Sequence, residues 1–331
     1  MILTSLSAIY GAVASWRRQW YARDPRRRQY LSRPVVSIGN LRVGGTGKTP
    51  IVAHVARFLL EHGQRPSILT RGYARRRPTD GVTVVSDGRT VVADLSRAGD
   101  EPLMLARALP GVPVLVGPSR HTAGLLAERR FGATVHVLDD GFQHVQLARA
   151  VDLLVIDEED LTDRPVPGGR LREPLVNASA ADAVLVTSQD VAAGDRIGRA
   201  LGVPTVFHVT RSLRAPRALA GGDPVVVPTG SRVFAIAAVA RPKRFFADLV
   251  AAGWQVVGSL AFRDHHAFTE RDVARIRAAA DAAAAAIVLT TEKDAVRLEA
   301  CDVHGLRIAS VPLTASVDPA PAFGSWLLER L

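Results

Sequence analysis

The segment from residue 36 to residue 50 reads VSIGNLRVGGTGKTP, a glycine-rich turn that runs into a lysine and a hydroxyl residue. The residues before it have the valine and isoleucine content of a buried strand, and IVAHVARFLLEHG has the apolar spacing of a helix. A strand, a glycine loop and a helix in this order are typical of a phosphate-binding loop. Backbone N–H groups would hold the phosphates, Lys48 would reach the β- and γ-phosphate oxygens, and Thr49 would ligate magnesium.

One position of this segment departs from the usual phosphate-loop pattern. Glycine normally stands five residues before the Gly-Lys pair, and this chain has Arg42 there. The Gly44-Gly45 pair is similar to variant loops of the KGGxGKT type, although Val43 replaces their additional lysine. An ordinary glycine-rich turn between strand and helix is the alternative interpretation. We expect the nucleotide to be bound by Arg42, Val43, Gly44, Gly45, Thr46, Gly47, Lys48 and Thr49.

Acidic residues that follow two other apolar segments are candidates for the metal site. A phosphate loop is normally completed by an acidic side chain that follows a neighbouring hydrophobic strand and acts on Mg²⁺. Asp139-Asp140 follows ATVHVL, and Asp157-Glu158 follows VDLLVI. Periodicity does not distinguish these two pairs, and solvation of a strand end is the alternative role for either.

The elements that must position these residues alternate between strand and helix along the chain. Segments such as VDLLVIDEED and ADAVLVTSQD are rich in β-forming residues, end in polar residues and are interspersed with helical segments such as GDEPLMLARAL. This alternation predicts a doubly wound, largely parallel sheet, in which ligands bind at the carboxyl ends of the strands. We divide the chain into an N-terminal amphipathic helix with a basic flank at residues 1–30, a nucleotide-binding core domain at 31–204, an extended β connector at 205–230 and a smaller α/β domain at 231–331.

Composition and charge restrict the class of protein and its partners. A chain of 331 residues is consistent with about two domains, and its single cysteine, Cys301, excludes a disulfide framework and a cysteine metal cluster. The formal net charge of +10 indicates an anionic partner, which could be nucleic acid, a phospholipid surface or a phosphorylated substrate.

The N-terminal segment favours a membrane surface. MILTSLSAIYGAVASW carries no charged side chain, and the following RRQWYARDPRRRQY is rich in arginine. On a helix, one apolar stripe would be formed by Ile2, Leu6, Ile9, Val13, Trp16 and Trp20. The apolar run is shorter than the ~20 residues of a spanning helix, and no basic region precedes it as in a secretory signal. We expect a helix that lies in the membrane interface, with packing on the protein's own core as the alternative.

A series of segments suggests a family. In order along the chain they are VSIGNLRVGGTGKTP, ILTRGYARR, GDEP, VHVLDDGFQH, GRLREP, DHHAFT and TEKDAVRL. Together they resemble the tetraacyldisaccharide 4′-kinase family, the lipid A 4′-kinases of Gram-negative bacteria, and that family also lacks the glycine that Arg42 replaces. The resemblance implies a P-loop kinase-like αβα sandwich joined by a β-ribbon to a second, smaller αβα domain, with the active site in the cleft between them.

The same resemblance implies an activity and a location. A phosphoryl group would pass from ATP, with Mg²⁺, to the 4′-hydroxyl of a tetraacylated glucosamine disaccharide 1-phosphate, which gives lipid IVA. This lipid kinase would act at the cytoplasmic face of the bacterial inner membrane as a peripheral or monotopic protein. Its partners would be the lipid A precursor and an anionic membrane surface, and we expect a monomer.

The resemblance also implies roles for individual residues. Asp100 matches the family's proposed catalytic carboxylate, His265 would hydrogen-bond this carboxylate, and Lys48 would stabilise charge on the departing γ-phosphoryl group. Magnesium would be held by Thr49, Asp139 and Asp140, with Asp140 favoured. The disaccharide or its phosphate would be bound by Arg71, Tyr73, Gln143, His144, Arg172 and Glu173. A helix cap is the alternative for Asp100, and bracing of a loop is the alternative for each substrate-binding residue. Two further expectations concern residues outside this set. We expect His266 to lie on the surface or to cap a helix. We expect Lys293 and Asp294 either to serve the site or to form an ion pair with each other at the start of a helix.

Two functions of other classes remain as alternatives. A P-loop switch ATPase or GTPase acting on a membrane or nucleoid partner would need an NKxD motif or a second loop lysine, and the sequence contains neither. A nucleic-acid-binding module would use the basic charge, but the arginines are scattered among loops without interleaved aromatic residues. We therefore expect no nucleic-acid partner.

Overall fold

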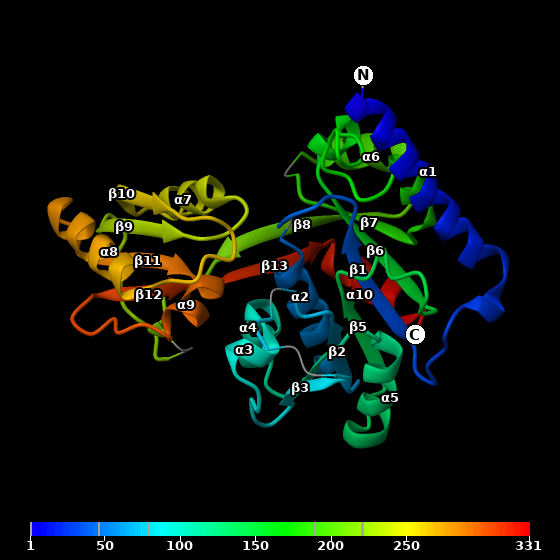
Figure 1. Ribbon diagram of the computed structural model, residues 1–331, viewed down its shortest axis with the longest axis horizontal. Coiled ribbons are helices and arrows are strands. Elements are labelled where there is room, and N and C mark those ends of the chain that lie inside the picture. The colour runs from blue at the N-terminus through cyan, green and yellow to red at the C-terminus, as the bar shows by residue number, and fades with distance from the viewer. Residues whose placement is uncertain (1, 46, 74, 78–79, 189, 220–221) are drawn as a thin grey trace.

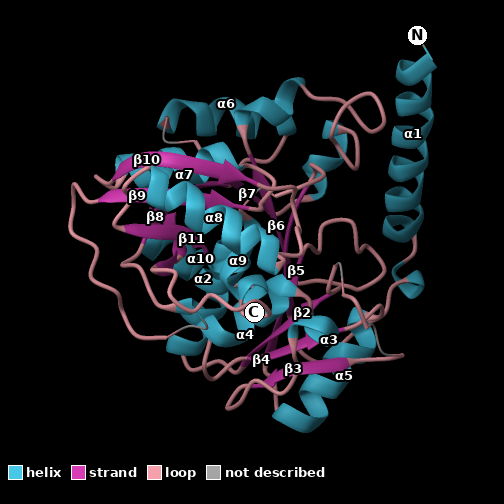
Figure 2. Cartoon of the chain, turned by 60° about the vertical axis from the view of Figure 1, so that its left-hand side comes forward, coloured by secondary structure: helices cyan, strands magenta, loops and turns pink. Residues whose placement is uncertain are grey.

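The computed structural model describes residues 2–45, 47–73, 75–77, 80–188, 190–219 and 222–331. These residues form two domains, each built on its own sheet, which lie at either end of a two-stranded ribbon (Figure 1). The larger domain carries the N-terminal helix α1 (Ile2–Arg23) along one side (Figure 2).

The large sheet has the strand order β13-β8-β7-β6-β1-β5-β2-β4-β3. Its strands are β1 (Val35–Asn40), β2 (Pro66–Thr70), β3 (Thr83–Asp87), β4 (Pro113–Val116), β5 (Val135–Asp139), β6 (Val151–Ile156), β7 (Ala183–Val186), β8 (Val206–Leu213) and β13 (Leu313–Asp318). Neighbouring strands are parallel except in the pairs β3–β4 and β8–β13. The central strands are buried on both faces, which explains why valine, isoleucine and leucine predominate in them. β1 lies between β5 and β6, so its carboxyl end brings the phosphate loop beside the ends of both neighbours.

Helices cover both faces of this sheet. On one face α2 (Lys48–Glu61), α4 (Asp100–Ala108) and α10 (Ala320–Leu328) bury apolar side chains against alternate residues of the strands. On the other face pack α5 (Arg120–Phe131) and α6 (Val191–Leu201). Shorter helices are α3 (Leu95–Ala98) and the 3₁₀ segments η1 (Pro25–Arg27), η2 (Glu158–Thr162) and η3 (Leu175–Ala180). The predicted αβα sandwich is confirmed.

The smaller domain repeats this architecture around a four-stranded parallel sheet in the order β10-β9-β11-β12. Its elements are β9 (Arg232–Ala237), α7 (Pro242–Ala251), β10 (Gln255–Ala261), α8 (Glu270–Ala282), β11 (Ile287–Thr291), α9 (Glu292–Leu298) and β12 (Ile308–Val311). Phe245 and Leu249 of α7 pack on one face of the sheet, and Val273 and Ile276 of α8 pack on the other. The second αβα domain is therefore also as expected.

The connector is a ribbon of two antiparallel strands: the chain leaves the large domain along β8 and returns to it along β13. β8 pairs first with β7 in the large sheet and then with β13, and the two strands extend together towards the smaller domain (Figure 1). The division by sequence placed all of 231–331 in the smaller domain, whereas β13 and α10 return to the large one. The physical reason is burial, because Phe323 and Leu327 of α10 lie in the core of the large domain. The ring of Phe323 packs edge to face against that of Phe207, with 5.1 Å between the ring centroids.

Helix α1 presents its predicted apolar stripe to the outside. Trp16 and Ile9 are each 62% exposed, and the exposed members of the stripe are Leu6, Ile9, Val13, Trp16 and Trp20. Packing of this stripe on the protein's own core is therefore not what the structure shows. Among the described residues, none of the helices combines the length and the apolarity that crossing a bilayer would need.

The opposite side of α1 is small and polar. Ser7 and Ser15 form hydrogen bonds of 2.8 and 3.0 Å with the segment 168–177. Gly11 lies so close to this segment that an added Cβ would be 3.0 Å from a proline ring carbon. Arg18 completes this side with an ion pair of 2.8 Å to Glu173. The helix is thus attached through its polar side and leaves its apolar side uncovered.

Candidate active site

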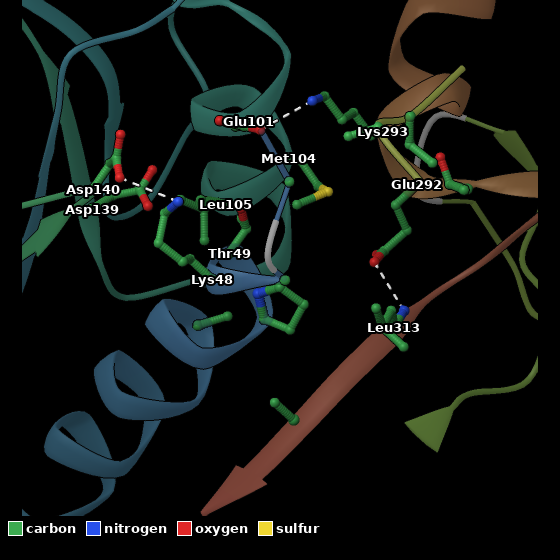
Figure 3. A pocket seen from close by; sticks show the side chains of 18 of the residues that line it. Lys48, Thr49, Glu101, Met104, Leu105, Asp139, Asp140, Glu292, Lys293 and Leu313 are labelled. Atoms are coloured by element: carbon green, nitrogen blue, oxygen red, sulfur yellow. Dashed lines mark hydrogen bonds and ion pairs between the residues drawn. The ribbon is translucent and has the colours of Figure 1, made fainter. Parts of the chain in front are cut away.

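A cavity of about 1620 Å³ lies between the two domains. The large domain contributes the phosphate loop, the end of β5 and the start of α4, and the smaller domain contributes residues 263–265 and 291–293. Figure 3 shows Lys48 with Asp139 and Asp140 on one wall, and the Glu101–Lys293 ion pair that crosses between the domains. The cavity is where the family resemblance places the active site.

The phosphate loop connects β1 to α2. Gly44 and Gly47 have φ angles of 98° and 76°, a region that glycine tolerates and other residues avoid. Gly47 is the N-cap of α2, so the backbone N–H groups of the first helical turn, which have no acceptor within the helix itself, lie at the cavity. Of the predicted nucleotide-binding residues, those that line the cavity are Val43, Gly44, Gly45, Gly47, Lys48 and Thr49. Thr46 lies outside the described residues.

Arg42 lines no part of this cavity in the described structure, because acidic residues hold its side chain. The guanidinium is 3% exposed and forms ion pairs with Asp160 at 3.0 Å and Glu159 at 3.2 Å. Any nucleotide contact of Arg42 would therefore come from its backbone. The backbone oxygen is itself hydrogen-bonded by Arg172 and Asn40. Arg42 thus braces the loop where other phosphate loops have glycine.

Lys48 lies beside Asp140 at the carboxyl ends of β1 and β5. Its Nζ lies 2.7 Å from Asn40 Oδ1 and 3.2 Å from Asp140 Oδ1. Asp140 has a left-handed backbone with φ 55°, and Arg172 binds its two carboxylate oxygens with bonds of 2.7 and 2.8 Å. A non-glycine residue in this conformation carries strain, which is common where geometry serves function.

The other acidic pair lies on the opposite side of β1. Asp157 accepts a hydrogen bond from Thr187 at 3.2 Å and lines a separate small pocket together with Arg42. Glu158 belongs to η2 and pairs with Arg196 at 2.9 Å. The geometry therefore favours Asp139 and Asp140 as the carboxylates that serve the phosphate loop.

The two adjacent carboxylates differ in their proton affinity. Complete burial, reinforced by Glu101 and Asp140, raises the pKa of Asp139 to about 7. Burial also opposes ionisation of Asp140, but the positive charges of Lys48 and Arg172 outweigh it and hold the pKa of that carboxyl below its usual range. Such a pair can hold one proton near neutral pH while keeping one fixed negative charge.

Asp100 is the first residue of α4, and side chains of the smaller domain surround its carboxylate. The N-cap position belongs to Gly99, so Asp100 is not the helix cap. His265 Nδ1 lies 3.0 Å from Oδ2 of Asp100, and Arg297 donates to the same oxygen through Nε at 2.9 Å and through Nη2. Although burial opposes it, His265, Lys293 and Arg297 hold the pKa of Asp100 below its usual range.

Lys293 lies beside the ring of His265. Its Nζ lies 3.3 Å from Nε2 of His265 and 3.0 Å from Glu101 Oε1. His265 therefore has a cation beside each ring nitrogen, since Arg297 Nη2 lies 3.2 Å from Nδ1, the nitrogen that faces Asp100. His265 also has a left-handed backbone with φ 59°, so both its backbone and its ring are constrained.

The neighbours of these residues have structural roles. His266 pairs with Asp272 at 3.0 Å beside the capping box of α8, as its expected capping role requires. Lys293 and Asp294 do not pair with each other within the described contacts. Lys293 crosses to Glu101, whereas Asp294 binds Arg297 at 3.0 Å and accepts the backbone N–H of Ala238.

The predicted substrate-binding residues divide into two groups. Those that line the cavity are Arg71, Tyr73, Gln143, His144 and Arg172. Tyr73 is 71% exposed, with its ring centroid 5.5 Å from that of His265. Glu173 is different, because it is 4% exposed and bound to Arg18 and Asn177. Its predicted role is therefore replaced by a structural one, and the alternative of bracing a loop describes it better.

Sequence reasoning missed two cationic residues at the site. Arg297 reaches Asp100 from another domain, and its place in the segment TEKDAVRL is the signal that could have found it. Arg120 is 6% exposed at the cavity, and burial together with Arg71 lowers its pKa to about 10. It remains a cation at neutral pH, beside a second cation and at a surface where an anion can bind. Its position directly after GPS, at the start of a helix that follows a strand, is the signal that could have found it.

Comparison with known proteins gives a consistent result. The family model described as Tetraacyldisaccharide-1-P 4′-kinase matches residues 1–331. The tetraacyldisaccharide 4′-kinase of Geobacter sulfurreducens is 40% identical over 337 residues, covering 97% of this chain and 90% of the relative. That of Anaeromyxobacter is 41% identical over 303 residues, covering 88% of this chain and 80% of the relative. The crystal structure of LpxK from Aquifex aeolicus in complex with ATP has a TM-score of 0.80 and 28% identity, covering 100% of this chain and 99% of that one.

Proposed function

This chain belongs to the tetraacyldisaccharide-1-phosphate 4′-kinase family, and we propose that it transfers the γ-phosphoryl group of ATP to the 4′-hydroxyl of a tetraacyldisaccharide 1-phosphate. The enzyme is a lipid kinase of lipid A biosynthesis, and the family match does not favour a switch ATPase or GTPase. The observation that carries the proposal is one cavity with two functional walls. Lys48 and Asp140 line the nucleotide side, and His265 lines the side where the domains meet. Asp100 is 5% exposed and outside the described lining, and it meets the cavity through its contact of 3.0 Å with His265.

The nucleotide side of the cavity suits a triphosphate. The N–H groups at the start of α2 and the positive end of its dipole would bind phosphate oxygens. Lys48 would move its contact from Asp140 to the β- and γ-phosphate oxygens and stabilise the charge that develops on them. Arg172 would then remain as the partner of Asp140 and keep its carboxylate in place.

The residues at the loop also fit Mg²⁺. Thr49, Asp139 and Asp140 provide hydroxyl and carboxylate oxygens, the donors that this ion prefers. The described residues contain no group of three His, Cys, Asp or Glu side chains suited to holding a metal, and Mg²⁺ bound with a nucleotide takes several ligands from phosphates and water. When bound, the ion would neutralise charge on the β- and γ-phosphates. Thr70 donates to Asp139 Oδ2 at 3.2 Å and would orient that carboxylate.

Magnesium binding should depend on pH through Asp139. Because its pKa is raised to about 7, its proton must leave before the carboxylate can interact with the cation. We expect the affinity for Mg²⁺ in the presence of a non-hydrolysable ATP analogue to rise as pH increases through about 7 and then to level off. Calorimetric titration in buffers of different ionisation enthalpy measures the released proton.

The control for this experiment is Asp139→Asn, which cannot titrate. It should bind Mg²⁺ more weakly and lose the part of the pH dependence that the nucleotide's own titration does not explain. Equal pH dependence in the two proteins would show that Asp139 does not serve the metal.

The acceptor side of the cavity suits a sugar hydroxyl. Both His265 and Arg297 bind Oδ2 of Asp100, whereas Oδ1 accepts one backbone hydrogen bond from Glu101 at 2.8 Å. A carboxylate oxygen has two lone pairs, so Oδ1 can also orient a hydroxyl. In a loose transition state the hydroxyl proton is lost late, so a carboxylate of low pKa can still accept it. Asp100 would thus position the 4′-hydroxyl and take its proton as the bond to phosphorus forms.

The phosphate of the lipid acceptor calls for a cationic surface. Arg71 and Arg120 line the cavity beside His144, and the pKa of His144 is lowered to about 4 by burial and by nearby arginines. An imidazole without charge can accept or donate one hydrogen bond without adding to the repulsion among these cations. We assign the two arginines to an anionic group of the lipid and His144 to a hydroxyl or amide beside it.

The exposed side of α1 would bind the bilayer that contains the substrate. Isoleucine, valine and tryptophan side chains of its stripe would enter the interface, and arginines at the end of the helix would lie among anionic headgroups. We propose that the enzyme acts at the cytoplasmic face of the inner membrane, where ATP is available.

Replacing Ile9 and Trp16 together by serine should release the enzyme from vesicles. Each buried apolar side chain is worth about 1.5–3 kcal/mol, so the partition coefficient should fall at least 100-fold. Flotation with vesicles that contain anionic lipid measures the change, and ATP affinity should stay the same. Val226→Ser is the matched control, because Val226 is 89% exposed but lies far along the chain, between β8 and β9. Unchanged flotation of the double variant would mean that α1 does not bind the bilayer.

The proposed activity is tested by acceptor dependence. ADP formation from ATP should require the disaccharide 1-phosphate and should fail with an acceptor whose 4′-oxygen is methylated. Equal turnover with and without the lipid acceptor would reject the kinase assignment in favour of an ATPase.

A further inference from the structure

Four consecutive carbonyl oxygens, those of residues 141–144, each accept a hydrogen bond from an arginine. Arg149 donates to the first at 3.1 Å and to the last at 2.8 Å. Arg18 donates to the oxygen of residue 142 at 2.7 Å, and Arg17 donates to that of residue 143 at 3.0 Å. Arg17 and Arg18 belong to α1, so two of these four contacts come from the helix with the exposed apolar stripe.

Arg18 also reaches the site by a second route. Its guanidinium lies 4.0 Å from the ring centroid of Phe142 and binds both carboxylate oxygens of Glu173 at 2.8 and 3.0 Å. The residue before Glu173 is Arg172, whose guanidinium donates hydrogen bonds to both carboxylate oxygens of Asp140. Arg18 is 9% exposed, and it does not line the cavity within the described part of the chain. Its contacts therefore point to a residue that acts through others.

The loop that Arg18 holds follows directly after Asp140. Asp140 has a left-handed backbone, a conformation that persists only when its surroundings impose it. The loop is also connected to the phosphate loop's strand, because Gln143 Nε2 donates to the backbone oxygen of Asn40 at 2.9 Å. Asn40 in turn binds Lys48. A displaced loop would therefore disturb both Asp140 and the lysine of the phosphate loop.

We propose that α1 is a positioning element of the active site as well as its membrane contact, with Arg18 as the positioning residue for the loop 141–144 and for the Arg172–Asp140 pair. This inference rests on the proposed function and deepens it. The two sides of α1 then have separate tasks: the apolar side binds the bilayer, and the polar side fixes the catalytic loop. Membrane binding would stabilise the seated helix and so favour turnover where the lipid substrate is found.

The test uses Arg18→Lys, because complete removal of Arg18 would leave Glu173 buried without its cation. A lysine keeps the charge beside Glu173 but lacks the planar fork that also reaches the oxygen of residue 142. Arg129→Lys is the matched control, since Arg129 is an exposed arginine in the last turn of α5. Hydrogen exchange of residues 139–146, vesicle flotation, and kcat with Mg²⁺ dependence in detergent micelles are compared for the full-length proteins.

For Arg18→Lys we expect faster exchange of residues 139–146, a kcat lower by about tenfold and a higher Mg²⁺ requirement, with flotation unchanged. Arg129→Lys should match the wild type in exchange and kcat. The inference is overturned if the two variants show the same exchange and the same kcat. If Arg18→Lys unfolds at a lower temperature, Glu173→Gln provides the same comparison with Arg18 intact. If the wild type transfers no phosphoryl group, the proposed function fails, while the exchange measurement still decides whether Arg18 holds the loop.

Discussion

Replacing Lys48 by alanine should lower kcat by about 100- to 1,000-fold while the protein stays folded. The ammonium of Lys48 lies at the start of α2, 3.2 Å from Asp140 and within reach of phosphates bound at the helix N-terminus. Its charge matters most in the transition state, when negative charge moves onto the oxygen that bridges to the β-phosphate. Steady-state kinetics with saturating ATP and lipid acceptor measure the loss.

Two variants make this result specific. Lys243→Ala removes an exposed lysine of α7 and should leave kcat within about twofold of the wild type, since surface substitutions have small effects. Lys48→Arg keeps the charge but changes its reach, so it should recover only part of the activity. Near-normal turnover of Lys48→Ala would show that the glycine loop does not bind the transferring phosphate.

The second large effect is expected at Asp100. Asp100→Asn keeps the size of the side chain but removes the charge that accepts the hydroxyl proton, so kcat should fall by about 100- to 10,000-fold with little change in the KM for ATP. His265→Ala should give a smaller loss, because the imidazole acts through Asp100 Oδ2 at 3.0 Å. Residues that act as a unit are not additive, so the double variant should be hardly worse than Asp100→Asn alone.

The pH–rate profile tests the same pair independently. The hydrogen bond from His265 is one cause of the low pKa of Asp100. Its removal should let that pKa rise towards the ordinary value of an aspartic acid, and the protonated acid cannot accept a proton. The acidic limb of the profile should therefore move to higher pH in His265→Ala. If the two substitutions lower kcat by independent factors and the acidic limb does not move, the two residues are not coupled. The catalytic carboxylate would then be Asp139 or Asp140.

Much of the fold can be predicted from sequence because its signals are local. The central strands are buried on both faces, so each is rich in valine, isoleucine and leucine, and the helices between them have a helical apolar period. The return of β13 and α10 to the large domain could not be predicted in this way. A strand that alternates apolar and polar residues, such as LTASVD, fits either domain equally well when a helix follows it. Only the pairing with β8 and the burial of Phe323 decide between them.

The candidate site shows the same division between local and distant signals. The glycine loop, Lys48 and Asp140 follow from motifs at the ends of neighbouring strands. The contacts of Arg297 with Asp100 and of Arg18 with Glu173 join residues 197 and 155 positions apart, and no spacing rule indicates them. From the sequence, the charges of Arg42 and Glu173 suggest that these residues bind a ligand. In the structure, both side chains instead form buried ion pairs with other residues of the protein.

The most direct test of the central claim is the fate of the γ-phosphoryl group. ATP labelled at the γ-position is incubated with the enzyme, Mg²⁺ and tetraacyldisaccharide 1-phosphate in micelles, and phosphorus NMR of the lipid product locates the new phosphate. We predict that the label enters the lipid as a second phosphomonoester on the 4′-oxygen, and that Lys48→Ala and Asp100→Asn both abolish this signal. Label released only as inorganic phosphate, or attached at another position of the lipid, would contradict the account.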